Sequence, residues 1–482
     1  MTDTADRTEH DTETSDTETS ETGTVESFTE LVDSLRSTFR SGRTRSVDWR
    51  REQLRAMHQM LVEHEADFVE ALHADLGRPP LEAYVADIGT TKAEIKHAIK
   101  HVGSWAKVKR ANPGLTSMPA KARIMPEPLG VALIIAPWNY PIQLLLSPMV
   151  AAIAAGNCIV AKPSELSPAC SAVLARLIPR FLDNDAITVV EGGVAETTAL
   201  LEIPFDHIFF TGSTNVGRVV MQAAAKHLTP VTLELGGKSP TIVAADADLE
   251  VAARRILWGK HLNAAQTCIA PDYVLVESSV RDRLVDIMAD VLGEFLGADP
   301  AASRDFGRIV NDRHFERLTA LLESAGGTVA IGGVTDAATR FIAPTVIVDP
   351  DLDAPIMTEE IFGPLLPVLS VDSIDAAIDF VNDRPKPLAL YVFSGSSETA
   401  DHVLEHTSSG GACVNQTILH INTPNMPFGG VGPSGMGSYH GKFGFDAFSH
   451  HKSVLIKPQK PDPKLLYPPY SPLKDKIIHT AM

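Results

Sequence analysis

Cysteine is scarce in this chain, with four residues in 482. The four are dispersed and form no CxxC pair, and neither they nor the seventeen histidines show a spacing typical of a metal site. A disulfide framework and a bound metal are therefore not expected. Free thiols in a chain of this length favour a reducing, cytoplasmic location. The cysteines are Cys158, Cys170, Cys268 and Cys413.

Long apolar runs are also lacking. The longest, Leu144–Ala155, is interrupted by Ser147 and Pro148 and is too short to cross a bilayer. The first residues are acidic and polar, whereas a signal peptide needs a basic start and an apolar core. From Lys452 onward the chain carries six lysines against two aspartates and no apolar anchor. We therefore expect no membrane attachment.

Basic residues are outnumbered, and the formal net charge is −18. Half of this charge lies in residues 1–30, where ten acids stand against Arg7 alone. This tail is rich in Thr, Ser, Asp and Glu and has little to bury, so we expect it to be disordered. The remaining residues are only mildly acidic, which argues against binding to nucleic acid.

Short apolar runs alternate with helical periodicity over most of the chain. Apolar residues from Val47 to Lys109 recur at helical spacing, whereas the Pro-rich segment 111–130 predicts a connector with short strands. The alternation that follows predicts βαβ units, and hence an α/β fold with parallel sheets in two domains. Ligands of such sheets gather at the carboxyl ends of the strands. Strands are expected at 131–136, 158–161, 187–190, 207–210, 231–233, 241–244 and 273–276, and helices at 142–155, 168–181, 195–201, 214–227, 249–262 and 280–296.

Cys268 stands in the segment Asn263–Pro271, between a predicted helix and a predicted strand. A lone cysteine most often packs as a small hydrophobe in the core, and that interpretation stays open here. The neighbouring Gln266 and Thr267 instead favour a loop. A thiol on a loop at a domain junction can be partly exposed and can form a thiolate, which is the reactive species.

Two other polar residues directly follow predicted strands. Glu234 lies between two leucines, so partial desolvation would raise its pKa and suit it to act as a base; the alternative is an ion pair with Lys238. Asn139 lies between Pro137 and Pro141, where its amide could donate to a developing oxyanion. The alternative for Asn139 is a simple turn-forming role.

Two features could contact a phosphate or a ribose, and a third matches a nucleotide-binding motif only in its letters. The segment Gly212–Gly217 follows a strand and opens a helix, so its backbone can approach a pyrophosphate. A literal GxGxxG at Gly430–Gly435 has no strand before it and is interrupted by Pro433, so we reject it. Lys162 and Glu165 end another strand and could hold a ribose or a phosphate, or could equally be solvated charges.

Seven short motifs run in the order found in the aldehyde dehydrogenase superfamily, and the chain resembles this superfamily from about residue 30 onward. Segments 224–230, 266–272 and 434–441 are similar to its class 3 branch, which acts on fatty or aromatic aldehydes. Ala265 departs from the class pattern, which commonly has Ser and then Gly before Gln-Thr-Cys, and leaves the nucleophile assignment intact. The motifs are Pro137–Pro141, Lys162–Glu165, Phe210–Gly217, Leu233–Pro240, Gln266–Cys268, Glu360–Pro364 and Pro427–Gly432.

The resemblance implies that Cys268 is a nucleophile whose thiolate attacks an aldehyde carbon, and that Asn139 and the backbone N–H of Cys268 hold the oxyanion. Hydride then leaves for NAD or NADP, and Glu234 activates the water that hydrolyses the thioester. Substrate contacts are implied at Tyr140, Ile418 and His420. Implied cofactor contacts are Lys162 and Glu165 at the adenosine ribose, Ser213 at the pyrophosphate, Glu360 and Phe362 at the nicotinamide ribose, and also Trp138, Gly212 and Gly217.

The fold implied by the resemblance is an aldehyde dehydrogenase-like α/β fold, and a homodimer is expected from the resemblance alone. A Rossmann-type cofactor domain stands beside a second α/β catalytic domain and a small β element for bridging and oligomerisation. The expected division is a disordered tail at 1–30, an NAD(P)-binding domain at 31–112 and 131–235, a catalytic domain at 236–415, bridging strands at 113–130 and 428–457, and a C-terminal tail at 458–482.

Three other functions are compatible with parts of this sequence. A CoA-acylating dehydrogenase would resolve the thioester with CoA, but such branches generally lack the base found here as Glu234. A nucleotide-independent cysteine esterase would need a histidine near Cys268, for which His261 or His420 could be proposed. A crystallin-like structural role is disfavoured by the intact nucleophile, base and oxyanion donor. The mixed apolar character of the segment 418–426 favours a medium or long aliphatic aldehyde, or an aromatic one, over a charged semialdehyde.

Overall fold

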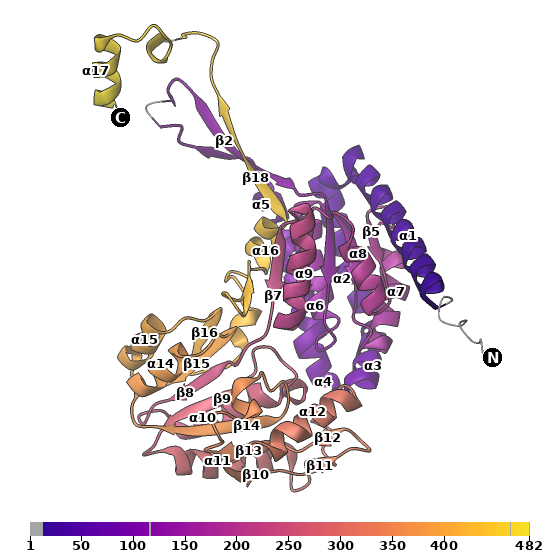
Figure 1. The fold of residues 1–482 in the computed structure, drawn as a ribbon, viewed down its shortest axis with the longest axis vertical. Coiled ribbons are helices and arrows are strands. Elements are labelled where there is room, and N and C mark those ends of the chain that lie inside the picture. The colour runs from indigo at the N-terminus through magenta and orange to yellow at the C-terminus, as the bar shows by residue number, and fades with distance from the viewer. Residues whose placement is uncertain (1–12, 115–116, 463, 482) are drawn as a thin grey trace, which may run out of the picture.

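The computed structural model describes residues 13–114, 117–462 and 464–481 (Figure 1). Its N-terminal part is helical, as the apolar spacing predicts. Ser46 caps the second helix by accepting a hydrogen bond from the Trp49 backbone N–H, and the third helix ends at Gly77, which takes the left-handed conformation at φ 61°. The helices are α1 (Glu13–Ser41), α2 (Val47–Glu63), α3 (Glu65–Leu76), α4 (Pro80–Ala83), the π-helical turn η2 (Tyr84–Gly89) and α5 (Thr90–Trp105).

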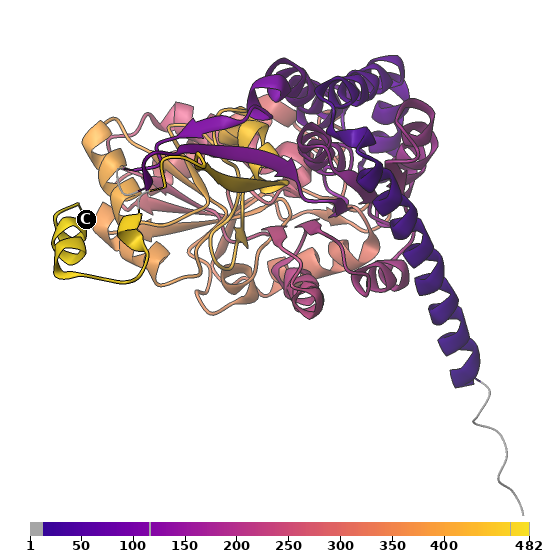
Figure 2. The ribbon, with the colours of Figure 1, turned by 90° about the horizontal axis from the view of Figure 1, so that it is seen from above.

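The acidic tail differs from the expectation of disorder. Helix α1 begins at Glu13 and continues without interruption to Ser41, so residues 13–30 are helical and extend away from the body of the molecule (Figure 2). The C-terminal half of this helix is anchored, because Val32 and Leu35 are buried in the core. Burial of these two side chains stabilises the C-terminal half of the helix. The helix then extends N-terminally into a segment whose composition alone predicts disorder. Residues 1–12 lie outside the described residues.

A six-stranded sheet, in the order β17-β7-β6-β3-β4-β5, forms the first α/β unit. All of its strands are parallel except the short β17. The chain runs outward from β3 to β5 and then returns to β6 on the other side of β3, so β3 and β6 flank a point where a crevice opens. The strands are β3 (Val131–Ile135), β4 (Cys158–Lys162), β5 (Ile187–Val189), β6 (His207–Thr211), β7 (Val231–Glu234) and β17 (Gly435–Met436); the helices are α6 (Gln143–Ala155), α7 (Pro168–Phe181), α8 (Val194–Leu201) and α9 (Thr214–His227).

A seven-stranded sheet, in the order β10-β13-β14-β9-β8-β15-β16, forms the second α/β unit, and only its edge strand β10 is antiparallel. Its five inner strands are buried on both faces and therefore read as continuous apolar runs in the sequence, whereas the edge strands β10 and β16 are largely or partly exposed. The strands are β8 (Pro240–Val243), β9 (Tyr273–Glu277), β10 (Thr328–Ile331), β13 (Thr345–Val348), β14 (Leu365–Val371), β15 (Ala389–Phe393) and β16 (Gly411–Val414); the helices are α10 (Leu249–His261), α11 (Arg281–Leu296), α12 (Asp312–Glu323), α13 (Pro355–Thr358), α14 (Ile374–Asn382) and α15 (Ser397–His406), and a two-stranded ribbon joins β11 (Thr335–Asp336) to β12 (Phe341–Ile342).

A third, antiparallel sheet joins segments that are more than 300 residues apart in the chain and projects from the body (Figure 1). It contains β1 (Lys109–Ala111), β2 (Lys121–Pro128) and β18 (Ser449–Ile456). Two details differ from the expected bridging segments. Strand β1 falls before residue 113, whereas β17 joins the six-stranded sheet and α16 (Gly441–Ala447) packs on α6. The domain boundaries themselves stay a prediction.

The C-terminal segment continues beyond the projecting sheet and ends in α17 (Pro472–Ala481). No helix within the described parts of the chain is both long and apolar enough to span a bilayer. Nor do the described residues bring together three or more His, Cys, Asp or Glu side chains in a way that could hold a metal ion.

Candidate active site

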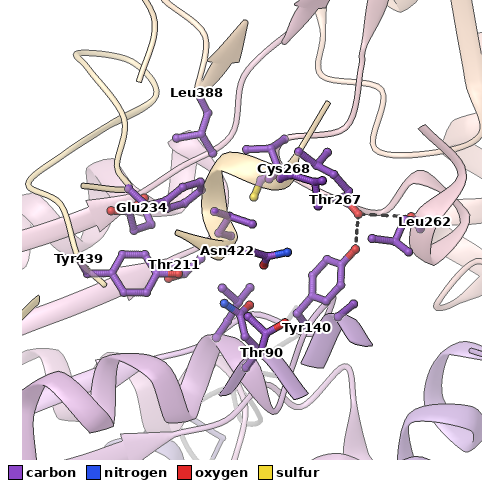
Figure 3. A pocket seen from close by; sticks show the side chains of 18 of the residues that line it. Thr90, Tyr140, Thr211, Glu234, Leu262, Thr267, Cys268, Leu388, Asn422 and Tyr439 are labelled. Carbon is purple, nitrogen blue, oxygen red and sulfur yellow. Dashed lines mark hydrogen bonds between the residues drawn. The ribbon is translucent and has the colours of Figure 1, made fainter. Parts of the chain in front are cut away.

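Two cavities meet at Cys268 and Glu234, between the two α/β units. The sheet-edge cavity, of about 760 Å³, lies against the carboxyl ends of β3 and β6 and is lined by Trp138, Asn139, Gly212, Ser213 and Glu360, among others. The apolar cavity, of about 890 Å³, lies on the other side. Cys268 and Glu234 line both cavities, and Figure 3 shows the Cys268 sulfur pointing into the space between Glu234 and Tyr140. A molecule in either cavity can therefore reach the same sulfur atom.

The loop before Cys268 has an unusual backbone. Asn263, Ala264 and Ala265 all have positive φ (56°, 50° and 63°), a conformation that costs a non-glycine residue roughly 1–2 kcal/mol. Buried polar contacts hold the loop in this form. The Asn263 side chain donates to the carbonyl oxygens of Asn139 (2.8 Å) and Gln266 (3.1 Å). The Gln266 side chain in turn donates to Asn263 O (3.0 Å) and accepts from the Val310 N–H (2.9 Å), which fixes the chain that carries Cys268.

The Cys268 thiol is partly exposed, unlike those of Cys158 and Cys170, which are fully buried. The interpretation of Cys268 as a core hydrophobe is therefore less favoured. Burial, together with the nearby carboxyls of Glu360 and Glu234, raises the thiol pKa to about 12, while the backbone N–H groups of Cys268 and Ile269 oppose this rise. The thiol is protonated in this state, so a reaction must first remove its proton.

Glu234 ends β7 and is buried. Neither of its carboxyl oxygens has a hydrogen-bond partner among the described residues, and burial raises its pKa well above the ordinary value. The alternative ion pair with Lys238 does not form, because the Lys238 ammonium lies 2.9 Å from Asp272 and also donates to the Ile356 carbonyl. Glu234 is thus an unpaired carboxyl aimed into the site, as a proton acceptor requires.

Asn139 is fixed through both its side-chain amide and its backbone carbonyl oxygen. Its side-chain Nδ2 donates to Gln266 O at 3.0 Å, which leaves a second N–H free for a ligand. The backbone carbonyl oxygen of Asn139 accepts from Asn263 and from the fully buried Arg78, whose guanidinium pairs with Asp87. No sequence pattern points to Arg78 and Asp87, because they stand in connecting and helical segments with no motif of their own.

The sheet-edge cavity has the features of a dinucleotide site. Ser213 caps the 14-residue helix α9 and presents its N-terminus to the cavity. The Trp138 and Phe362 rings meet edge to face at 5.4 Å. Glu360 is held so closely against the Gly236 backbone that a Cβ on this glycine would fall 2.0 Å from its Oε2. Burial raises the pKa of Glu360 to about 8, and its Oε1 has no partner among the described residues.

Three of the expected cofactor contacts lie outside the lining of the sheet-edge cavity. Gly217 packs one turn into α9, where a Cβ would overlap Leu235 at 2.6 Å, so its role in this structure is close packing. Lys162 and Glu165 lie farther along the same sheet edge, at the end of β4. Lys162 is buried with its Nζ 3.9 Å from Glu165, which excludes the solvated-charge alternative for the lysine, whereas Glu165 is exposed.

Two of the three expected substrate contacts line the apolar cavity, and the third does not. Tyr140 and Ile418 line the apolar cavity, and the Tyr140 hydroxyl is 2.6 Å from Thr267 Oγ1 (Figure 3). His420 lies outside the lining residues, with its Nδ1 3.3 Å from Cys413 Sγ. The remaining wall comes from segments far apart in the chain, which sequence patterns do not connect: Val85, Leu144, Trp258, Leu262, Leu388, Phe428 and Tyr439.

Neither histidine proposed for a cysteine esterase lines a cavity with Cys268. His261 is buried with its Nδ1 2.9 Å from the Leu257 carbonyl oxygen, and His420 contacts Cys413. Burial lowers the pKa of both rings, to about 3 and about 4 respectively. Neither of these two histidines is therefore placed to act as the base that such an esterase needs.

Known proteins resemble the chain over most of its length. A model of the Aldehyde dehydrogenase family matches residues 4–454. The chain is 51% identical to aldehyde dehydrogenase family 3 member A2 of Rattus norvegicus, over 92% of each chain, and 48% identical to the dimeric NADP-preferring aldehyde dehydrogenase of Canis lupus familiaris, over 92% of this chain and 98% of that one. The substrate-bound Staphylococcus aureus AldH superposes with a TM-score of 0.91 at 46% identity, over 94% of this chain and 98% of that one.

Proposed function

This chain belongs to the aldehyde dehydrogenase family and oxidises aldehydes with NAD or NADP, and we propose that it does so through a thioester on Cys268, with Asn139 as oxyanion donor and Glu234 as hydrolytic base. One observation carries the proposal: Cys268 and Glu234 line both cavities. An aldehyde in the apolar cavity and a nicotinamide in the sheet-edge cavity would therefore meet at the sulfur.

The sheet-edge cavity fits the cofactor. The N-terminus of α9 at Ser213 favours a pyrophosphate, because the free backbone N–H groups and the helix dipole attract an anion there. Glu360 and Phe362 would hold the nicotinamide ribose, with Trp138 beside them, and the exposed Glu165 would face the adenosine ribose near Lys162. The nicotinamide, when bound, supplies the hydride acceptor.

In the first step the Cys268 thiol releases its proton to solvent water, and the resulting thiolate attacks the aldehyde carbon and forms a thiohemiacetal. The negative charge then rests on the former carbonyl oxygen, where the free N–H of Asn139 and the backbone N–H of Cys268 would stabilise it. Loss of one such donor typically costs about 100- to 1,000-fold in rate. Departure of hydride from the same carbon leaves a thioester on the sulfur.

In the second step Glu234 takes a proton from water, which attacks the thioester and releases the carboxylic acid. An unpaired, desolvated carboxyl with a raised pKa is a better proton acceptor than an exposed one. Glu234 lies on the walls of both cavities, and we propose that the hydrolytic water reaches it from the substrate side after hydride transfer.

The substrate we propose is a medium or long aliphatic aldehyde, or an aromatic one. The apolar cavity is walled by Leu144, Trp258, Leu388, Ile418 and Phe428, which would leave a charged semialdehyde without a partner for its second charge. Rates with a panel of aldehydes, each assayed with NAD and NADP separately, would test this class and the cofactor preference.

We propose that the protein works as a homodimer in the cytoplasm. The dimeric canine relative and the projecting sheet, with its unpaired edges at β1 and β18, support the dimer. The four unpaired cysteines support a reducing compartment. Analytical ultracentrifugation would test the dimer, and a monomer at micromolar concentration would contradict it.

The decisive experiment compares Cys268→Ala and Glu234→Gln with a matched thiol control, Cys413→Ala. Cys268→Ala should abolish aldehyde-dependent cofactor reduction while cofactor binding is retained, and Cys413→Ala should retain activity. Glu234→Gln should give a rapid burst of reduced cofactor, about one per site, followed by slow turnover. Turnover by Cys268→Ala, or unaltered steady-state turnover without a burst in Glu234→Gln, would refute the assigned roles.

A further inference from the structure

A second apolar cavity, of about 1,210 Å³, lies beside the substrate cavity between α10, α11 and α4. It takes no part in the mechanism above. Its wall consists mainly of large hydrophobic side chains: Leu81, Leu257, Leu292, Phe295, Leu296 and Phe306. We refer to it as the α10–α11 groove.

The groove adjoins the substrate cavity. Val85, Trp258 and Leu262 line both spaces, so the two share a wall on η2, α10 and the turn that follows α10. Val85 is 49% exposed and Trp258 is 37% exposed. Large apolar side chains thus stay at the surface where the two cavities adjoin, and an extended ligand leaving one cavity can pass over them into the other.

The polar groups of the groove are largely engaged by the protein itself. The Glu82 carboxyl accepts from the Asn263 backbone N–H at 2.6 Å and lies 3.7 Å from Arg78. His261 contacts the Leu257 carbonyl through Nδ1, and Asp305 is exposed. The groove therefore suits hydrocarbon better than a charged or strongly hydrogen-bonding group.

We propose that the α10–α11 groove is the subsite for the distal hydrocarbon of a long-chain aldehyde. The inference rests on the proposed function, since the carbonyl must lie at Cys268 for the chain to extend past Trp258. Short aldehydes are held within the substrate cavity alone, and longer chains gain affinity for each methylene that enters the groove. Burial of one methylene is expected to raise kcat/KM by about fourfold.

The test is a homologous series of straight-chain aldehydes from butanal to hexadecanal, assayed with the wild-type protein, Phe295→Asp, Leu296→Gln and the control Val62→Asp. Phe295 and Leu296 are half-buried and line the groove but not the substrate cavity, whereas Val62 is an exposed apolar residue on α2. Both groove variants should keep wild-type kcat/KM for butanal and hexanal. They should lose tenfold or more with dodecanal and hexadecanal, and the control should follow the wild-type series.

Three results would overturn the inference. One is a loss of kcat/KM by the same factor at every chain length in the groove variants, which would indicate a general defect. Another is a wild-type series that does not rise beyond hexanal. A third is a changed sedimentation coefficient with unchanged chain-length selectivity, which would assign the groove to a second copy of the chain. If no aldehyde is oxidised even by the wild-type protein, the proposed function fails rather than the groove.

Discussion

The buried ion pair of Arg78 and Asp87 lies behind Asn139, the proposed oxyanion donor, and breaking this pair should separate stability from catalysis. Both side chains are inaccessible to solvent. Arg78 donates to the Asn139 carbonyl and, at 3.3 Å, to the Asn263 side chain. Asp87 also accepts from the Gln143 backbone N–H at 2.6 Å. The perturbation is Asp87→Asn, alone and combined with Arg78→Met.

The expected loss of stability follows from the burial of the two charges. Asp87→Asn keeps an acceptor for the Gln143 N–H but removes the nearer counter-charge of the guanidinium and leaves only Glu82, at 3.7 Å. Breaking a buried ion pair in this way costs about 3–5 kcal/mol. Adding Arg78→Met removes the stranded charge and fills most of its volume. The double variant should therefore regain most of the lost stability, because replacing a buried pair with apolar groups is often neutral.

Unlike stability, catalytic activity should not recover in the double variant. Without Arg78, the Asn139 carbonyl keeps only the Asn263 donor, so the amide is less well oriented. A misplacement of about 1 Å at a reacting group can cost about 100-fold in rate. We expect kcat to fall by 10- to 100-fold, with little change in the KM for cofactor.

The assay pairs urea unfolding, followed by tryptophan fluorescence, with steady-state kinetics on one aldehyde. Asp87→Asn should shift the first unfolding transition strongly to lower urea, and the double variant should shift it back. A single variant as stable as wild type would contradict the expected loss of stability. A double variant that recovers full activity along with its stability would contradict the orienting role of Arg78.

Three smaller changes test individual residues. Burial raises the pKa of Glu360 to about 8 from an ordinary 4.5, so the folded chain keeps a proton that the unfolded chain releases, and stability declines as pH rises between these values. Glu360→Gln removes that decline, so its Tm gain over wild type should be larger at pH 8 than at pH 5; equal gains would contradict this. His420→Ala should change kcat/KM by less than about threefold, because His420 contacts Cys413 outside the cavity wall, and a loss of 100-fold would restore it to the site. Ala265→Gly relieves about 1–2 kcal/mol of strain at φ 63° but adds about 0.5–1 kcal/mol of unfolded-state entropy, so urea midpoints should show a small net stabilisation; a clear destabilisation would show that the Ala265 methyl contributes packing.

The sequence predicted closely the elements of the first α/β unit and, as far as Leu296, those of the second. The helices Pro168–Phe181 and Thr214–His227 begin and end where apolar spacing and capping residues place them, and the strand at Val131–Ile135 ends one residue earlier than expected. Such features depend on neighbours within a few residues, so a local pattern is sufficient to read them. The order of the motifs likewise identified Cys268, Glu234 and Asn139 as candidates.

Other features depended on partners far away in the chain. Nothing near Lys238 indicates that it pairs with Asp272 instead of Glu234, and nothing near Arg78 indicates that it orients Asn139. The helical state of residues 13–30 depends on burial of the following turns, which composition does not report.

The sequence by itself determined the alternation of strands and helices, the family and the chemical types of the reacting groups. Only the tertiary structure decided which of those groups share a space. Cys268 and Glu234 lie at the junction of two cavities, Tyr140 and Ile418 line one of them, and His420 lies outside both. The physical reason is that periodicity and capping act over a few residues, whereas a cavity wall is assembled by packing between segments separated by hundreds of residues.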